Sequence, residues 1–172
     1  ATAHILSKEG LEKATTNRIA AKAGVSIGSL YQYFPNKEAL VRALNDRHIH
    51  ELLALLYSRV EEVWEAPLDI AVKAVVHAMV EVHRVDPDLH RVLVNATPSV
   101  GALEDTRRVE EEAAALLVRF LTSRQTELRP LDLTLSAFML VHSVEALTHA
   151  AVLEYPELLN GENFVEETAR MI

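Results

Sequence analysis

The stretch TTNRIAAKAGVSIGSLYQYFPNK, residues 15–37, decides the fold of this chain. Its first half has small and apolar residues at helical spacing, and Gly24 interrupts that pattern. Ser26 then stands where an N-cap belongs, and a second short helix ends before Pro35. Two short helices joined by a Gly-containing turn predict a helix-turn-helix over about residues 15–34, whose second helix fits a DNA major groove.

Small residues at the turn would let the two helices approach closely, and Val25 and Leu30 are expected to fill the space between them. Residues 24–28 also spell G-x-S-x-G, the nucleophile elbow of hydrolases. That elbow requires a strand before the serine, and the sequence before Ser26 is helical. We therefore expect no enzyme.

The same stretch resembles the tetracycline-repressor (TetR) family of bacterial transcription regulators. The matching residues are Thr15-Thr16, Ile19-Ala20, Ala23 to Ser26, Gly28, Leu30-Tyr31, Tyr33-Phe34 and Lys37-Glu38, ending at Leu40. The rest of the chain fits the family in helical character and length. The resemblance implies a DNA-binding head, a helical ligand-binding body and a homodimer.

Side chains in this stretch suit either base edges or phosphates. Ser29 and Gln32 lie three residues apart on one helix face and suit base edges. The hydroxyls of Tyr31 and Tyr33 and the ammonium of Lys37 suit phosphates, as does the N-terminus of the first helix. The predicted DNA-binding set is Thr15, Thr16, Asn17, Ser26, Ile27, Gly28, Ser29, Tyr31, Gln32, Tyr33 and Lys37.

The resemblance adds a second argument for part of this set. Residues matching DNA-contacting positions of the family are Ser26, Gly28, Tyr31, Tyr33 and Lys37. Ile27 stands where the family frequently has a basic residue and offers only an apolar contact, such as one to a thymine methyl. The operator sequence therefore stays open.

Charge is divided unevenly along the chain, whose net charge is −8. Residues 1–47 carry seven Lys/Arg and four acids, a net +3, and the remainder carries 10 bases and 21 acids, a net −11. A basic head on an acidic body can bind phosphates at one end. We expect a helix-turn-helix DNA-binding domain at 1–46 and a helical ligand-binding and dimerisation domain at 47–172.

The remaining sequence predicts helices and no strand. Apolar residues make up 49% of the chain, with only 5 Gly and 6 Pro. We expect an all-α fold of about nine helices, with a three-helix helix-turn-helix head at the N-terminus. Beyond the motif, the helices are expected at about 37–65, 67–85, 89–95, 102–127, 131–154 and 163–172.

Cysteine is absent, which excludes disulfides and thiolate metal sites and suits a reducing compartment. Apolar runs fall short of a membrane span, and no signal peptide opens the chain. We therefore expect a cytoplasmic protein with no membrane partner and no cofactor.

The body offers weaker candidates. A ligand cavity is implied by the resemblance, and the candidate lining residues are Tyr57, Trp64, His77, Met79, His83, Phe120, Phe138 and His142. The 131–154 helix is apolar almost all round, so we expect it to pair with the last helix and their symmetry mates in a four-helix dimer interface. Its candidate interface residues are Leu135, Met139, Glu145, His149 and Val152.

His142, Glu145 and His149 share one face of that helix at i, i+3 and i+7. Metal ligands, pocket groups, interface contacts and structural residues are all compatible with this spacing. The two ends are two turns apart, beyond the reach of one metal ion without help, so we predict no metal site. An all-α metal-binding protein or enzyme using this face is the alternative function.

The sequence thus predicts a ligand-responsive, DNA-binding transcriptional regulator. We expect a homodimeric repressor, released from a pseudo-palindromic double-stranded operator by a small, mainly apolar effector. An activator, or a regulator with a protein partner in place of the effector, stays open, and neither the operator nor the effector can be named.

Overall fold

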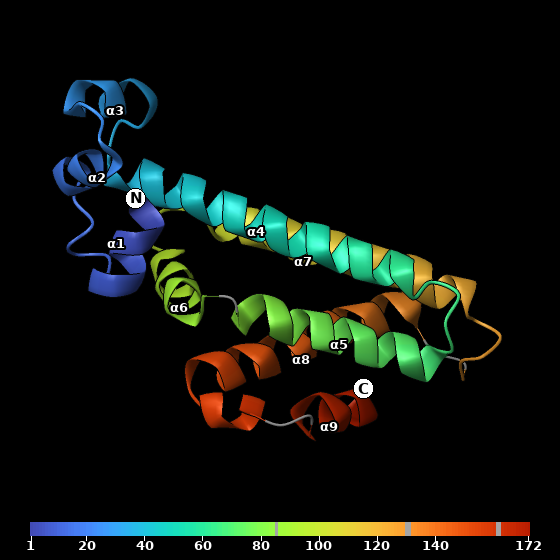
Figure 1. The fold of residues 1–172 in the computed structure, drawn as a ribbon. Helices are drawn as coiled ribbons and strands as arrows, with labels where there is room; N and C mark the ends of the chain where they lie inside the picture. The colour runs from blue at the N-terminus through green and yellow to red at the C-terminus, as the bar shows by residue number, and fades with distance from the viewer. Residues whose placement is uncertain (85, 130–131, 161–162) are drawn as a thin grey trace. The chain divides into compact units, whose positions relative to one another are not determined.

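The computed structural model describes residues 1–84, 86–129, 132–160 and 163–172. Over these residues the chain forms nine α-helices and one 3-10 helix, with no strand, which confirms the all-α prediction (Figure 1). The elements are α1 (Thr2–Glu9), α2 (Thr16–Ala23), α3 (Ile27–Tyr33), α4 (Lys37–Glu62), α5 (Leu68–Arg84), α6 (Pro87–Ala96), α7 (Leu103–Ser123), α8 (Leu133–Leu153), η1 (Pro156–Asn160) and α9 (Asn163–Met171). The residues at 130–131, where the sequence places a break and the start of a helix, lie outside the described part.

The chain divides into two compact units, which we call the head unit (residues 1–50 and 86–106) and the body unit (residues 51–85 and 107–172). The sequence placed residues 86–106 in the body, whereas in the structure they belong to the head unit. Apolar packing explains this, because Leu89 and Leu93 of α6 are buried in the same core as Ile5 and Leu6 of α1.

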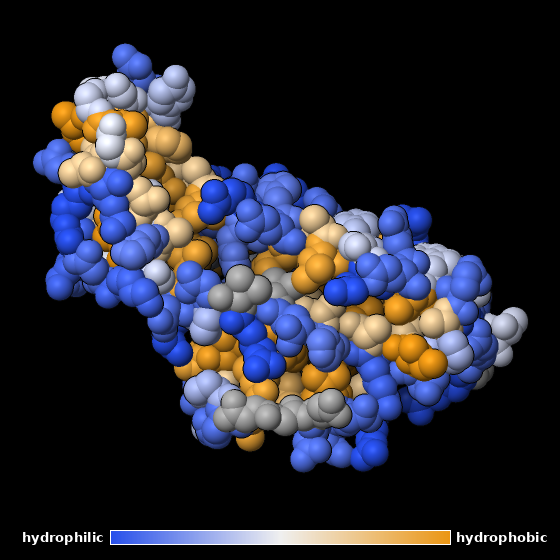
Figure 2. Space-filling view, in the orientation of Figure 1, coloured by the Kyte–Doolittle hydropathy of each residue, from blue (hydrophilic) through white to orange (hydrophobic). Residues whose placement is uncertain are grey.

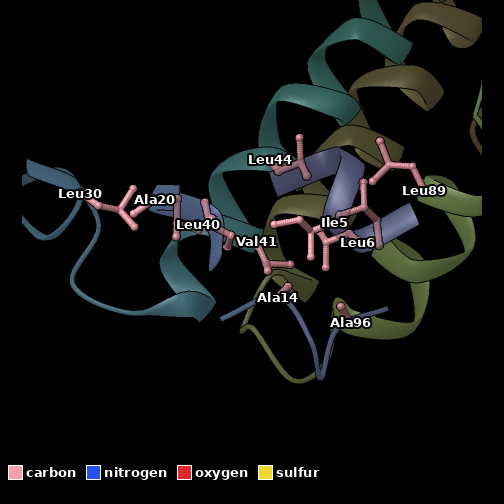
Figure 3. Packing of buried hydrophobic residues seen from close by; sticks show 12 residues of the cluster. Ile5, Leu6, Ala14, Ala20, Leu30, Leu40, Val41, Leu44, Leu89 and Ala96 are labelled. Carbon is pink, nitrogen blue, oxygen red and sulfur yellow. The ribbon is translucent and has the colours of Figure 1, made fainter. Parts of the chain in front are cut away.

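The head unit is built around one core, drawn in Figure 3. Ile5 and Leu6 are 2% and 0% exposed, and Val41 of α4 is fully buried beside them. Within α3, the buried residue is Leu30, 8% exposed. Val25, predicted to share that role, is 45% exposed. Its backbone N–H donates to the carbonyl of Ala20 (3.1 Å), so it terminates α2 instead of filling the interior.

The body unit has two apolar clusters. In the first, Leu116 and Phe120 of α7 pack with Val60 of α4 and Ala71 of α5, and Trp64 meets the edge of Phe120 at a ring-centroid distance of 5.5 Å. The second joins four elements, through Val80 of α5, Ala151 and Val152 of α8, Leu159 of η1 and Phe164 of α9. These clusters fix α5, α7 and α8 against one another within the unit.

α8 departs from the sequence prediction in one respect. It is long and apolar enough to cross a membrane by length and composition, with a mean hydropathy of 1.3 in its most apolar window. Core helices of soluble proteins pass the same test, so this is weak evidence for a membrane. Polar residues interrupt the run of apolar letters along α8, which is why the sequence showed no span, but the mean hydropathy of the helix stays high.

Candidate nucleic-acid interface

Local hydrogen bonds explain why α2 starts and stops where it does. Thr15 is its N-cap, and the Thr15 hydroxyl accepts from the backbone N–H of Arg18 (3.4 Å). At the other end Gly24 has φ 69° and ψ 26°, the left-handed conformation that glycine adopts without a side-chain penalty. Its N–H donates to the carbonyls of Ala20 and Ala21, which closes the helix.

α3 begins at a second cap. The hydroxyl of Ser26 accepts from the backbone N–H of Ser29 (3.0 Å), and the hydroxyls of these two residues are 2.8 Å apart. Ser29, predicted to read bases, therefore already has a partner and helps to fix the first turn. A Cβ added at Gly28 would meet only the Ser26 Oγ, at an ordinary 3.8 Å. Internal packing therefore does not require glycine at this position. The predicted reason for it, a close approach of the backbone to DNA, stays compatible with the structure.

The solvent-facing surface of α3 is uncharged. Gln32 is exposed, and Ile27, Tyr31 and Tyr33 are 38%, 50% and 78% exposed. The same helix, at the top left of Figure 1, appears in Figure 2 largely in the pale colours of intermediate hydropathy. Only Leu30 points inward as a buried residue. α3 thus presents hydrogen-bonding and aromatic groups outward while a single apolar side chain anchors it.

A side-chain contact joins α3 to the start of α2. The phenolic oxygen of Tyr31 lies 3.2 Å from Oγ1 of Thr16. Both groups belong to the predicted phosphate-contacting set, and they come from residues 15 positions apart. The turn therefore brings the N-terminus of α2 and the middle of α3 onto one surface.

Two of the seven basic residues counted in residues 1–47, Arg18 and Arg42, form ion pairs inside the head unit. The Arg18 guanidinium donates to both carboxylate oxygens of Glu9 (2.8 and 2.6 Å) and to the carbonyl of Lys13 (3.2 Å). This hydrogen-bonded ion pair lowers the pKa of the Glu9 carboxyl. Arg42 donates through two of its nitrogens to one carboxylate oxygen of Asp105 (3.1 and 2.9 Å).

The net charge of the head unit also differs from the value predicted for residues 1–47. Residues 86–106 add one base and four acids, which brings the net charge of the whole unit to zero. Attraction to phosphates must therefore be local. Lys22, exposed in the last turn of α2, and Lys37, partly exposed at the start of α4, flank α3. Within the described part of the chain neither ammonium group forms an ion pair, although the charge of Lys22 contributes to the lowered pKa of Glu9.

All eleven predicted DNA-binding residues lie on the N-terminus of α2, the turn, α3 and the first residue of α4, and each is exposed or partly exposed. The arrangement offers hydroxyls, an amide and flanking ammonium groups on one small surface. Contact with DNA stays a prediction.

The body unit contains an open cleft of about 290 Å³, lined by Tyr57, Glu61, Trp64, Leu116 and Arg119. Two of the eight predicted pocket residues, Tyr57 and Trp64, are among them. The Arg119 guanidinium lies over the Trp64 ring, 6.0 Å from its centroid. Sequence reasoning missed Glu61, Leu116 and Arg119, because their place in the cleft depends on how α7 packs against α4.

The other predicted pocket residues lie elsewhere. Phe120 is buried behind Trp64, and His77 is exposed on α5. His83 is 2% exposed, and its Nδ1 is 2.6 Å from the carbonyl of Met79. Phe138 and His142 contact each other on α8, with ring centroids 4.3 Å apart.

The predicted interface face of α8 is split. Leu135 and Met139 are 54% and 58% exposed, as an interface would require in a single chain. Val152 is only 2% exposed and packs in the core of its own chain, which corrects its predicted place in the interface. The ring of His149 lies 5.2 Å from that of His83, and burial lowers the pKa of His149.

The sequence grouped His142 and Glu145 with His149, whereas the structure groups them with Glu110. Their ligand atoms and a carboxylate oxygen of Glu110 on α7 all lie within 4.8 Å of one another. His149 is not part of this group, since it lies two turns from His142 along the helix.

Family models of known proteins match both parts of the chain. Residues 1–44 match the model described as "Bacterial regulatory proteins, tetR family", and residues 67–172 match "Tetracyclin repressor-like, C-terminal domain". The chain belongs to the tetR family. This membership confirms the resemblance seen in residues 15–40 and agrees with a regulator rather than an enzyme.

Individual tetR-family relatives are more distant. A nucleoid occlusion factor SlmA from Haemophilus ducreyi is 36% identical over 87 residues, which cover 51% of this chain and 42% of that protein. The SlmA of Pasteurella multocida is 34% identical over 93 residues and is covered to 45%. The chain thus spans less than half the length of these curated relatives.

Solved structures share the fold over nearly the whole chain. A putative transcriptional regulator from Pseudomonas aeruginosa PAO1 has a TM-score of 0.77 at 23% identity, covering 98% of this chain and 83% of that one. The fatty acid degradation regulator FadR from Bacillus halodurans has a TM-score of 0.76 at 18% identity, covering 99% and 89%. At these identities the likeness shows the tetR-family fold alone.

Proposed function

We propose that this protein is a cytoplasmic, DNA-binding transcription regulator that binds its operator as a homodimer and releases it when a small effector binds the body unit. The observation that carries the proposal is the surface of α3. Its polar and aromatic side chains face outward, it is anchored by Leu30, and Lys22 and Lys37 flank it.

An α-helix enters the major groove with base-reading side chains while flanking groups hold the phosphates. Gln32 is the exposed amide on α3, suited to the N6 and N7 edge of adenine. Tyr31, Tyr33 and Lys37 supply two phenols and an ammonium group for backbone oxygens. These are the components of sequence-specific duplex recognition.

A single head of this size contacts few base pairs, so a dimer that reads two half-sites gives useful specificity. The exposed apolar residues Leu135, Phe138 and Met139 on α8 provide a face for a second copy. The operator is then a pseudo-palindrome with half-sites separated by whole turns of the duplex.

The cleft between Tyr57, Trp64, Leu116 and Arg119 is the proposed effector site. Two aromatic rings and a leucine suit the apolar part of a small molecule, and Glu61 and Arg119 in the same lining suit a polar group on it. Release follows if the effector binds better to a conformation in which the dimer does not fit its operator, and reciprocity then requires operator DNA to weaken effector binding by the same factor.

Selection of bound duplexes from a random pool tests the proposal directly. We expect enrichment of one two-fold related motif by the unaltered chain, and loss of preference at one base position per half-site in Gln32→Ala. A Lys22→Ala variant serves as the control, because it should weaken binding without changing the motif. Absence of any enriched motif would show that the chain is not a sequence-specific DNA-binding protein.

A further inference from the structure

Two helices of the body unit bring together three side chains that the proposed function does not use. Glu110 comes from α7, and His142 and Glu145 come from α8, where a spacing of three places them on one face. One carboxylate oxygen of each glutamate and one ring nitrogen of His142 lie within 4.8 Å of one another, and all three residues are partly buried.

The cluster combines the two carboxylates of Glu110 and Glu145 with the imidazole of His142. Among the described residues, no Lys or Arg is recorded in an ion pair with Glu110 or Glu145. Two carboxylates and one imidazole, brought together from two helices, form a set of ligand atoms that can converge on one cation.

We propose that Glu110, His142 and Glu145 form a binding site for a divalent transition-metal ion, with Zn²⁺ as the reference ion. Imidazole nitrogen together with carboxylate oxygen suits Zn²⁺ and its neighbours better than Mg²⁺ or Ca²⁺, which prefer oxygen alone. The proposal concerns metal binding by the body unit and does not depend on operator binding.

The geometry needs only a small adjustment. Ligand atoms about 2.0–2.2 Å from a tetrahedral ion are about 3.4 Å apart, so rotation of the glutamate side chains closes the present spacing. Three protein ligands leave a fourth position open for water or an anionic group of a small molecule. The bound ion would also tie α7 to α8 inside the body unit.

Metal titration of the tag-free chain, stripped with a chelator, tests the proposal. The chain's own eight histidines already give a background of weak surface binding, and a histidine tag would add to it, so the tag is removed. We expect calorimetry to show one tight Zn²⁺ site per chain that Mg²⁺ does not fill, and thermal unfolding to shift upward with Zn²⁺. Glu145→Gln, Glu110→Gln and His142→Ala should each weaken this site by more than about tenfold, since even outer-shell partners of metal ligands are worth that much.

Matched controls are available on the same elements or the same unit. Glu112→Gln changes an exposed carboxylate of α7, and His77→Ala removes an exposed imidazole of α5, and neither should alter the tight site. The proposal is overturned if Zn²⁺ binds only at the weak background level, or if the tight site survives in all three ligand variants. A rise in thermal stability of Glu145→Gln, with no tight Zn²⁺ site in the unaltered chain, would also overturn the proposal.

Discussion

The phenolic oxygen of Tyr31 lies 3.2 Å from Oγ1 of Thr16, so a side-chain hydrogen bond joins the middle of α3 to the first turn of α2. Leu30 packs α3 against the core of the head unit, and this exposed hydrogen bond links the solvent-facing side of α3 to α2. Both hydroxyls belong to the predicted phosphate-contacting set, so we expect their mutual hydrogen bond to hold these two groups in position.

A double-mutant cycle with Tyr31→Phe and Thr16→Val measures this bond. The contact is exposed, so we expect a coupling of about 0.5–1 kcal/mol in the free energy of unfolding. Tyr31→Phe should also weaken binding to all duplexes alike, since it removes a phosphate ligand, while Thr16→Val leaves the phenol available. A Tyr31→Phe variant with unchanged DNA affinity would contradict the phosphate role.

Base reading and phosphate binding are expected to separate between Gln32 and Lys37. Gln32→Ala should cost about 1–3 kcal/mol on the preferred site and relax the preference there. Lys37→Ala should weaken binding to all sequences and reduce the slope of log affinity against log salt by about one contact per head.

Tyr33→Phe is the matched comparison for the lysine change. It should share the sequence-independent loss but leave the salt slope nearly intact, because a phenol carries no charge. Fluorescence anisotropy on specific and scrambled duplexes over a range of salt concentrations measures all three variants. A changed motif in Lys37→Ala, with uniform weakening in Gln32→Ala, would reverse the proposed orientation of α3.

Local chemistry explains why the motif was predictable. Thr15 and Ser26 as caps and Gly24 in the left-handed conformation act over a few residues, so their letters predict α2 and α3. Val25 was predicted to be buried because it is apolar, but the sequence does not show that its backbone N–H ends α2 and that its side chain stays exposed.

Contacts between distant segments could not be predicted in the same way. Glu110 joins His142 across two helices, and no period along either helix indicates that pairing. Residues 86–106 bring a net charge of −3 to the head unit, which cancels the +3 counted for its N-terminal residues. Tertiary packing decides both features, whereas helical periodicity reports only which side of a helix is apolar.

The Glu9–Arg18 pair predicts a pH dependence for the head unit. The pKa of Glu9 is lower in the folded chain than its ordinary value of 4.5, so ionised Glu9 stabilises the fold above that pH. The contribution is lost as the pH falls through the lowered value. Urea unfolding from neutral to acid pH should show a shallower acid-side decline in Glu9→Gln than in the unaltered chain. Equal declines would show that the pair does not affect stability.

Leu30 should matter to the head unit far more than its neighbour Val25. Leu30→Ala empties the 8% exposed anchor of α3 and should cost about 2–4 kcal/mol of unfolding free energy. Val25→Ala, at a 45% exposed position, should cost less than about 1 kcal/mol. Hydrogen exchange of α3 amides adds a local readout, since loss of the anchor should release α3 first. Similar losses in both variants would contradict the assignment of Leu30 as the anchor.

Dimer formation through α8 is tested at Met139. This residue is 58% exposed in the single chain and lies beside Leu135 and Phe138 on an apolar face. A carboxylate there would have to be desolvated in the interface, so Met139→Glu should yield a monomer while leaving the fold intact.

Ile70→Glu is the control, because Ile70 is comparably exposed, at 51%, but lies on α5. Light scattering at micromolar concentration gives the mass, and circular dichroism gives the helix content. A monomeric unaltered chain, or a dimer that Ile70→Glu disrupts and Met139→Glu does not, would place the interface elsewhere.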